Sequence, residues 1–447
     1  MSWGMGLGMG VGSAHRQTWA ELRRYPSALA GVALILLLVA LALHTLATVP
    51  YDQAVASWRS GEARLPINAR PLWSDWLSPG RAPRSQSLIA TEIDSEAFPG
   101  GRRLTQRIAL DYAYDDFPSE LALFLKPRDS ERAAFLRLTW RTPDGREINL
   151  GSRRLVGETR VALSQDRVLE QRLGRPAHLG LLAAADGEAV LSGRHTLTLE
   201  AVFFDPDAEL ASELLLYGRV HGLAGTDHQR RDLGLALRWG TPIALAFGLV
   251  AAVGTTLSTL VIAAVGVWYR GWVDALIQRL TEVNMILPLL PILVMVGTLY
   301  STSIWLMLGV VVALGIFSAG IKTYRAMLLP IREAPYIEAA RAYGASHLRI
   351  VMRYMLPRIL PVLIPTFVTL IPTFVFLEAS LAVLGLGDPV MPTWGKVLND
   401  AQAQSALYNG YYYWVLAPAA LLMLSGLGFA MLGFALDRVF NPRLRSL

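Results

Sequence analysis

The chain has 447 residues, of which 53% are apolar and 17% are charged, with a formal net charge of +6 and no cysteine. A soluble protein of this size would be less apolar, so the composition predicts a multipass membrane protein. The missing cysteines exclude disulfides and thiolate metal sites. The excess positive charge sits in arginines beside apolar runs rather than in a basic stripe with interleaved aromatics, so a nucleic-acid partner is not expected.

The chain begins with a tail, residues 1–26, in which glycine alternates from Gly4 to Gly12. This tail lacks the Lys-Ser/Thr pair of a phosphate-binding loop, and we expect it to be a flexible cytoplasmic segment. An apolar run follows at 27–49. It is longer than a typical signal-peptide core and no clear small-x-small cleavage pattern follows it, so we predict a retained first transmembrane helix.

Residues 50–225 have a different character, with about a quarter of the positions charged and no run able to cross a bilayer. Leu136, Leu138 and Trp140 alternate with polar residues, and Asp144-Gly145 then supplies a hairpin turn. A second alternating run extends from Leu197 to Phe203. The pattern predicts an inserted, mostly antiparallel β sandwich on the extracytoplasmic side.

The function of this insertion is not evident from its residues. Asp111, Asp115 and Asp116 surround two tyrosines and could form a cation or peptide-amine site, although the sequence favours a solvated loop. His, Asp and Glu nowhere cluster at metal-ligand spacing. We therefore expect a docking or structural module rather than a ligand-binding one.

The rest of the chain, 226–447, contains five more apolar runs. With the first run they give six predicted spans, at Ser27–Val49, Thr241–Trp268, Asn284–Tyr300, Ser303–Lys322, Ile359–Leu386 and Tyr412–Leu436. The loop after the fourth span is rich in basic residues, namely Lys322, Arg325, Arg332, Arg341, Arg349, Arg353 and Arg358. The loop after the fifth contains only Lys396. The positive-inside rule therefore places the first of these loops in the cytoplasm, and both chain termini with it.

The basic loop, at about 326–358, has the pattern of a docking element. Pro335 suits the first turn of a helix, Gly344 can end that helix in the left-handed conformation, and Ser346 can cap the next one. In the second helix, Leu348, Val351, Met352 and Met355 share one face, which must bury against something.

This loop resembles the EAA signature of permease subunits in bacterial binding-protein-dependent ABC importers, whose coupling helix fits a groove on the ATPase. The residues that match at that spacing are Glu338, Ala339, Ala340, Gly344, Leu356 and Pro357, while Tyr354 replaces the usual Ile. Arg341 lies within the same window. The resemblance implies that these residues contact the ATPase.

Further segments are similar to the C-type permeases of dipeptide, oligopeptide and nickel importers. Gly225-Thr226-Asp227 and Arg231-Asp232 resemble the element before the second span, with Arg230 in place of the usual Gly. The segments 377–387, 392–395 and 441–444 resemble the fifth span, its following loop and the C-terminal end. The insertion at 50–225 is much larger than is usual there, and the Ser-Arg pair and Gly-Ala-Arg element that often follow are missing, which leaves the substrate class open.

Three residues in the fifth predicted span are candidates for the translocation path. Glu378 is the one acid deep in a span, where an unpaired carboxylate is costly, so it should face the bundle or an aqueous path. Pro365 and Pro372 can kink the span, although proline is also tolerated in membrane helices. For Glu378 a structural hydrogen bond competes with substrate contact. Tyr411 to Trp414 indicate an interfacial aromatic belt.

The resemblance implies a complete assembly. This chain would be a type I importer-like subunit in the bacterial inner membrane, beside a second, B-type permease and lipid. It would sit on two ATPases that bind ATP and Mg, and take solute from an extracytoplasmic binding protein. The chain itself has no Walker A sequence and is not expected to be an enzyme or to bind a cofactor. The alternatives are a receptor or scaffold that senses a ligand through its β domain, and an ion-driven secondary transporter.

Overall fold

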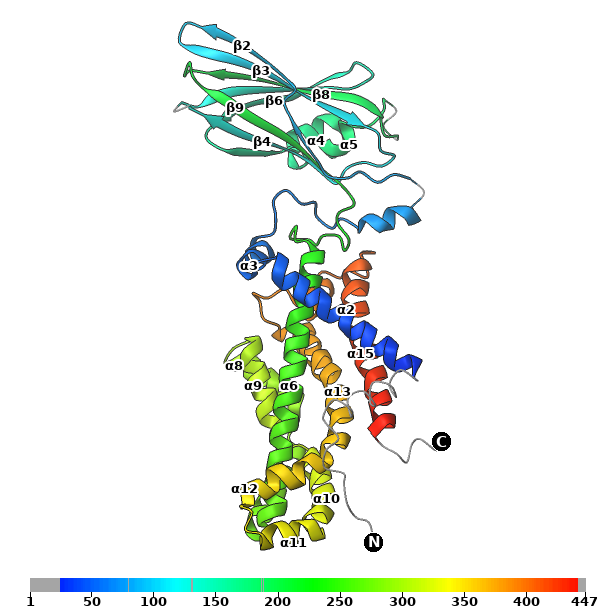
Figure 1. Cartoon of the computed structure of the whole chain (residues 1–447). Helices are drawn as coiled ribbons and strands as arrows, with labels where there is room; N and C mark the ends of the chain where they lie inside the picture. Colours follow the sequence, from blue (N-terminus) through cyan, green and yellow to red (C-terminus); the bar gives the residue numbers. More distant parts are fainter. Residues whose placement is uncertain (1–24, 79, 130–131, 186, 188, 441–447) are drawn as a thin grey trace. The chain divides into compact units, whose positions relative to one another are not determined.

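The computed structural model of the chain describes residues 25–78, 80–129, 132–185, 187 and 189–440. The glycine alternation of the tail and the 441–444 segment lie outside these residues. The chain divides into two compact units. The permease unit comprises Met1–Val55 and Leu235–Leu447, and the β domain comprises Ala56–Gly234 (Figure 1).

Among its described residues, the permease unit consists of helices and the segments that connect them. Its long helices are α2 (Pro26–Thr48), α6 (Leu233–Tyr269), α13 (Leu356–Leu381) and α15 (Tyr413–Phe440). Its shorter helices are α7 (Gly271–Ile286), α8 (Leu289–Leu299), α9 (Ile304–Ile316), α10 (Gly320–Arg332), α11 (Pro335–Ala342), α12 (His347–Ile350) and α14 (Trp394–Ala403). Two π-helical turns, η3 (Val351–Met355) and η4 (Ala382–Leu386), flank α13. Helix α3 (Tyr51–Ser60) leads from this unit into the β domain.

Four helices in the described part of the chain are long and apolar enough to cross a membrane by themselves. Two further pairs reach that length only across a bend, of 75° between α7 and α8 and of 43° between α9 and α10. The predicted span Asn284–Tyr300 therefore contains a break between α7 and α8, at Pro288. Leu287 precedes Pro288 and adopts an extended backbone, because the proline ring disfavours the helical conformation of the residue before it.

The second bend leaves carbonyl groups that side chains satisfy. The Asn284 side-chain amide donates to the carbonyls of Leu314 and Phe317, at 2.8 and 3.1 Å. The Thr259 hydroxyl lies 3.2 Å from the Gly315 carbonyl oxygen. A membrane helix can break only where such partners replace its lost internal hydrogen bonds.

The first helix packs along the last one. A Cβ on Gly31 of α2 would lie 2.8 Å from the Gly428 carbonyl oxygen of α15, so the two backbones meet where both residues lack side chains. Ala28, Ala435 and Leu436 are buried beside this crossing. Small residues permit such close approach between membrane helices. Figure 1 shows α2 crossing α15.

The β domain is a sandwich of two antiparallel sheets, as the sequence predicts. Its strands are β1 (Gln86–Ile89), β2 (Glu92–Phe98), β3 (Gly101–Tyr112), β4 (Glu120–Arg128), β5 (Ala134–Arg141), β6 (Glu147–Leu155), β7 (Thr159–Ala162), β8 (Gly193–Phe203) and β9 (Glu209–Tyr217). The sheet orders are β1-β9-β4-β7 and β2-β3-β8-β5-β6. Short helices η1 (Leu72–Leu77), η2 (Leu163–Gln165), α4 (Arg167–Leu173) and α5 (Ala177–Gly180) complete the domain.

The predicted alternation places one core between the two sheets. Leu136, Leu138 and Trp140 of β5 are buried with Leu121 and Leu123 of β4. The alternating run of β8 from Leu197 to Phe203 joins the same core. The predicted hairpin is confirmed: β5 pairs with β6, and Gly145 in the turn has φ +89°.

Candidate functional site

The EAA-like segment folds as a short helix, a glycine break and a second short helix. Pro335 occupies the first turn of α11, and Gly344 ends this segment with φ +76°. The Ser346 hydroxyl then caps α12 by accepting from the Arg349 N–H. A left-handed backbone disfavours residues with a Cβ, so the sequence prediction of a glycine break is confirmed.

One side of this loop is fixed to the helical bundle. Ile337 of α11, Ile350 of α12 and Met355 of η3 are fully buried. They share a core with Ala264 and Val267 at the end of α6. Burying side chains of this size stabilises each contact by about 1.5–3 kcal/mol relative to exposure. The loop is therefore packed against α6 rather than loosely tethered.

A tryptophan at the end of α6 adds polar contacts to this packing. The Arg341 guanidinium lies 4.5 Å and the Arg332 guanidinium 5.9 Å from the Trp268 ring centroid. The Trp268 indole N–H donates to Nδ1 of His347 at 3.1 Å. Arg270, two residues further, forms an ion pair with Glu333. Trp268 thus contacts both halves of the loop, one on each side of Gly344.

The other side of the loop exposes large apolar side chains, which we call the docking face. They are Tyr343, Leu348 and Met352, with exposed fractions of 91%, 73% and 55%. The sequence predicts that the apolar face of the second helix must bury against something. Within the chain, only Met355 of this face is buried and Val351 is half-buried, and the backbone forms a π-helical turn over Val351–Met355.

The predicted coupling residues divide between these two sides. Glu338, Ala339, Arg341 and Gly344 are exposed, and Ala340 is half-buried. Leu356 is buried in the core shared with α6, and Pro357 is exposed at the first turn of α13. The segment from Glu338 to Gly344 is thus accessible, while Leu356 anchors its C-terminal end.

The candidate path residues lie on α13, away from the loop. Pro365, Pro372 and Glu378 are all buried. At about 1.5 Å per residue, Glu378 lies about 33 Å along the helix from Leu356. The structure therefore does not bring these residues to the coupling loop, although one helix connects the two sets.

Glu378 has polar and apolar neighbours in the segment that follows α13. Its carboxyl group hydrogen-bonds with Thr393, whose hydroxyl also accepts from the Lys396 N–H at 3.1 Å. The neighbouring Trp394 is fully buried and donates its indole N–H to the Leu237 carbonyl of α6 at 2.9 Å. These contacts favour the structural interpretation of Glu378 that the sequence left open.

Sequence reasoning missed Trp268 and His347 as parts of this site. A tryptophan at the end of a span is ordinarily assigned to an interfacial belt. The signal that could have identified it is the set of arginines in the loop, because guanidinium groups pack on indole faces.

The fold and the loop together define a class of protein. A helical unit with four helices long and apolar enough to cross a membrane, among its described residues, and an anchored loop that exposes apolar side chains has the features of a membrane subunit. Residues 254–446 match the family described as binding-protein-dependent transport system inner membrane component.

The chain also resembles named relatives. It is 31% identical over 300 residues to a Brucella suis protein named as a peptide transport system permease, covering 65% of this chain and 94% of the relative. It is 32% identical to the glutathione transport system permease protein GsiD of Pectobacterium atrosepticum, covering 50% of this chain and 73% of the relative. GsiD of Escherichia coli is also 32% identical, with 72% of its length covered. The chain belongs to this family and is a permease subunit of an ABC importer of the peptide type.

Proposed function

We propose that the coupling loop transmits ATP-driven movements of partner ATPases to the permease helices. The observation that carries this proposal is the docking face of Tyr343, Leu348 and Met352, exposed on a loop that is packed against α6 and continuous with α13. A rigid loop between an apolar contact surface and two long helices can pass a displacement from one to the other. Glu338 to Gly344 supply the ATPase contact.

We place this subunit in an assembly with a second, B-type permease, two ATPases that bind ATP and Mg, and an extracytoplasmic solute-binding protein. Six spans, with the two bent helix pairs counted as one each, put both termini and the coupling loop in the cytoplasm. The β domain then lies outside. The basic residues of the loop support this orientation.

The names of the relatives support a short peptide as the solute. The path candidates remain Pro365, Pro372 and Glu378, buried along α13. We assign Glu378 to holding the segment around Thr393 rather than to contacting solute.

Substituting Gly344 tests the coupling role. Gly344→Val places a β-branched residue at φ +76°, a left-handed conformation that costs about 1–2 kcal/mol even without branching. A Cβ there meets no atom within 4 Å, so the effect comes from the backbone alone. We expect membrane insertion to persist, while ATPase co-purification and peptide uptake both fall. Gly309→Val is the matched control, since a Cβ at Gly309 also meets open space, within helix α9. Normal co-purification and uptake in the Gly344→Val protein would refute the assignment.

A further inference from the structure

The outer face of the four-stranded sheet of the β domain contains a groove with a volume of about 510 Å³. One cross-strand row of its floor runs through Ile89, Glu213, Phe124 and Arg160, which are successive partners on β1, β9, β4 and β7. The small side chain of Ala211 lies on the same face beside this row. Arg64, from the segment that leads into the sandwich, forms part of the lining. Ligand sites for small molecules have volumes of about 300–1,000 Å³, so the groove has the size of such a site.

The charges that line the groove do not cancel. Arg64 pairs with Glu213 at 2.8 Å, and Lys126 forms an ion pair with Glu158. These two pairs leave the guanidinium of Arg160 as the excess positive charge. The Arg160 side chain is 35% exposed, and among the described residues it makes a single hydrogen bond, to the Tyr217 hydroxyl at 3.3 Å. A guanidinium has five N–H donors, so most of its capacity is unused.

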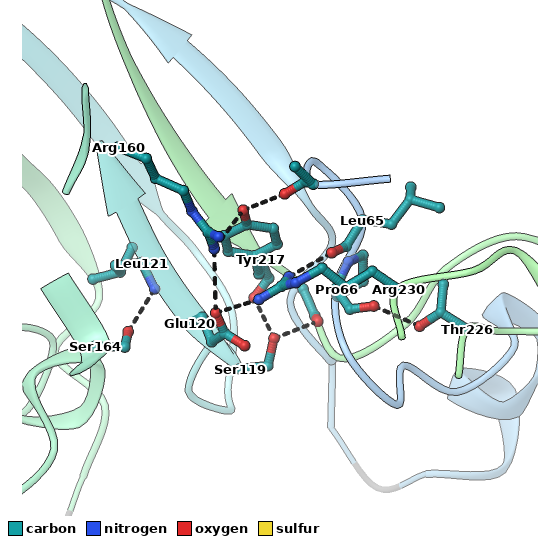
Figure 2. Close-up of polar contacts among 12 residues, drawn as sticks. Leu65, Pro66, Ser119, Glu120, Leu121, Arg160, Ser164, Tyr217, Thr226 and Arg230 are labelled. Atoms are coloured by element: carbon teal, nitrogen blue, oxygen red, sulfur yellow. Dashed lines mark hydrogen bonds and ion pairs between the residues drawn. The ribbon is translucent and has the colours of Figure 1, made fainter. Parts of the chain in front are cut away.

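Arg160 shares its nearest acid, Glu120, with Arg230, so the three side chains together carry one net positive charge (Figure 2). The Glu120 carboxylate oxygen Oε2 lies 2.6 Å from Arg230 and 3.9 Å from Arg160. Arg230 also donates to the Leu65 carbonyl at 2.6 Å and lies 4.5 Å from the Tyr217 ring centroid. Its backbone has φ +59°, so a residue with a strained backbone supplies the side chain that engages Glu120.

Two aromatic rings form an apolar wall beside the Arg160 guanidinium. The Arg160 guanidinium is 5.8 Å from the Phe124 ring centroid and 6.0 Å from that of Tyr217. Burial raises the pKa of Tyr217, and its hydroxyl donates to the Ala63 carbonyl at 2.5 Å. A planar cation beside an apolar wall binds a carboxylate whose neighbouring group is apolar.

We propose that this groove binds the terminal carboxylate of a short peptide. The carboxylate pairs with Arg160, the adjoining side chain packs on Phe124 and Ala211, and the peptide ammonium approaches Glu213 or Glu158. The groove thus gives the β domain a solute-binding role that the alternating strand pattern did not predict. The choice of a peptide rests on the proposed function, whereas the carboxylate chemistry does not.

Calorimetry on the full-length permease in lipid nanodiscs tests this site, with trialanine as the probe and trialanine amide as its uncharged counterpart. We expect trialanine to bind at least 10-fold more tightly than the amide. Arg160→Gln should abolish this preference. Arg137→Gln is the matched control, because Arg137 is an exposed arginine of the other sheet that lies opposite Glu200. It should bind like the unsubstituted protein.

A second variant tests the groove without changing its charge. Ala211→Leu fills the hollow and should weaken the binding of trialanine and its amide together. The proposal would be wrong if the unsubstituted protein bound trialanine and its amide equally well. It would also be wrong if no binding appeared even at 10 times the highest trialanine concentration of the control titration, or if both variants bound trialanine as the unsubstituted protein does. An Arg160→Gln substitution that changed only the delivery of solute by the solute-binding protein, and not trialanine binding to the permease, would contradict the proposal too. Trialanine binding should persist in the Gly344→Val protein, because that substitution tests only the coupling role. The groove proposal and the coupling proposal can therefore fail independently of each other.

Discussion

Arginines pack on the rings of Trp268 in the permease unit and of Tyr217 in the β domain, and the charges of these two clusters have different partners. In the coupling loop, Arg341 lies over Trp268, and among the described residues no carboxylate lies within ion-pair distance of it. In the β domain, Arg230 lies over Tyr217 and also binds Glu120, with side chains only 12% and 15% exposed. Arg341 thus keeps its charge at the surface, whereas the charge of Arg230 is paired in a largely buried place.

The two clusters differ in the free energy that is lost when one contact is broken. An exposed cation over an indole ring contributes about 0.5–1 kcal/mol and can separate without stranding a charge. A buried ion pair leaves an uncompensated charge when one partner is lost, at a cost of about 3–5 kcal/mol. Loss of the Trp268 contacts should therefore cost the loop little stability, whereas loss of the Arg230 ion pair should cost the β domain more.

The largest expected effect separates the two clusters directly. Glu120→Ala should lower the unfolding free energy of the β domain by about 3 kcal/mol, because it leaves Arg230 unpaired. Arg341→Ala should change the stability of the coupling loop by less than about 1 kcal/mol. Hydrogen exchange of β4 and α11 amides in the full-length protein measures both. If Glu120→Ala and Arg341→Ala changed stability by the same amount, the two clusters would not differ in this way.

Trp268→Leu tests how much the Trp268 cluster contributes to the stability of the coupling loop. It removes the ring that contacts Arg332 and Arg341 and the N–H that His347 accepts, and should destabilise the loop by about 1–2 kcal/mol. Amides of 337–347 should exchange faster, and less ATPase should co-purify. Trp305→Leu is the control, because Trp305 is a 62% exposed tryptophan of α9. Unchanged exchange would show that buried apolar side chains alone hold the loop.

Two substitutions of Arg230 separate its side chain from its backbone. Arg230→Ala loses both hydrogen bonds and keeps a Cβ at φ +59°. Arg230→Gly loses the same bonds but relieves the strain, so it should be the more stable of the two by about 1 kcal/mol. Denaturant unfolding, followed through exchange of β4 amides, compares them. If both variants unfold alike, the backbone at this position is not strained.

A pH dependence of the stability of the β domain is expected as well. His195 is fully buried against Trp140, its Nε2 bonds the Leu191 carbonyl, and its Nδ1 has no partner among the described residues. Burial lowers the pKa of His195, as it does that of His178, so the unfolded chain binds protons more readily. Stability should be fully present above about pH 6.5 and fall as the pH drops below it, by up to about 1.4 kcal/mol per pH unit for each histidine.

Unfolding at pH 7 and pH 5 measures this dependence. His195→Gln should reduce the change in unfolding free energy between the two pH values. His221→Gln, at a half-exposed histidine, is the control. A slope unchanged by His195→Gln would assign the dependence to other groups.

The sequence by itself determined the features that depend on neighbouring residues. Hydropathy predicted the apolar helices, alternation predicted the β5–β6 hairpin and the buried run of β8, and Pro335, Gly344 and Ser346 predicted the helix–break–helix of the coupling loop. Each of these follows from local backbone preference or from the period of a buried face. The EAA-like spacing identified the family for the same reason, since its residues lie within one short segment.

Only the tertiary structure decided which distant residues meet. The exposure of Leu348 and Met352 and the contacts of Trp268 on both sides of Gly344 depend on packing between helices. Glu120, Arg160 and Tyr217 come from three strands that pair in one sheet, and a connecting segment brings Arg230 to them. Periodicity records which face of a strand is buried but not which strand lies beside it, so the groove could not be predicted from the sequence.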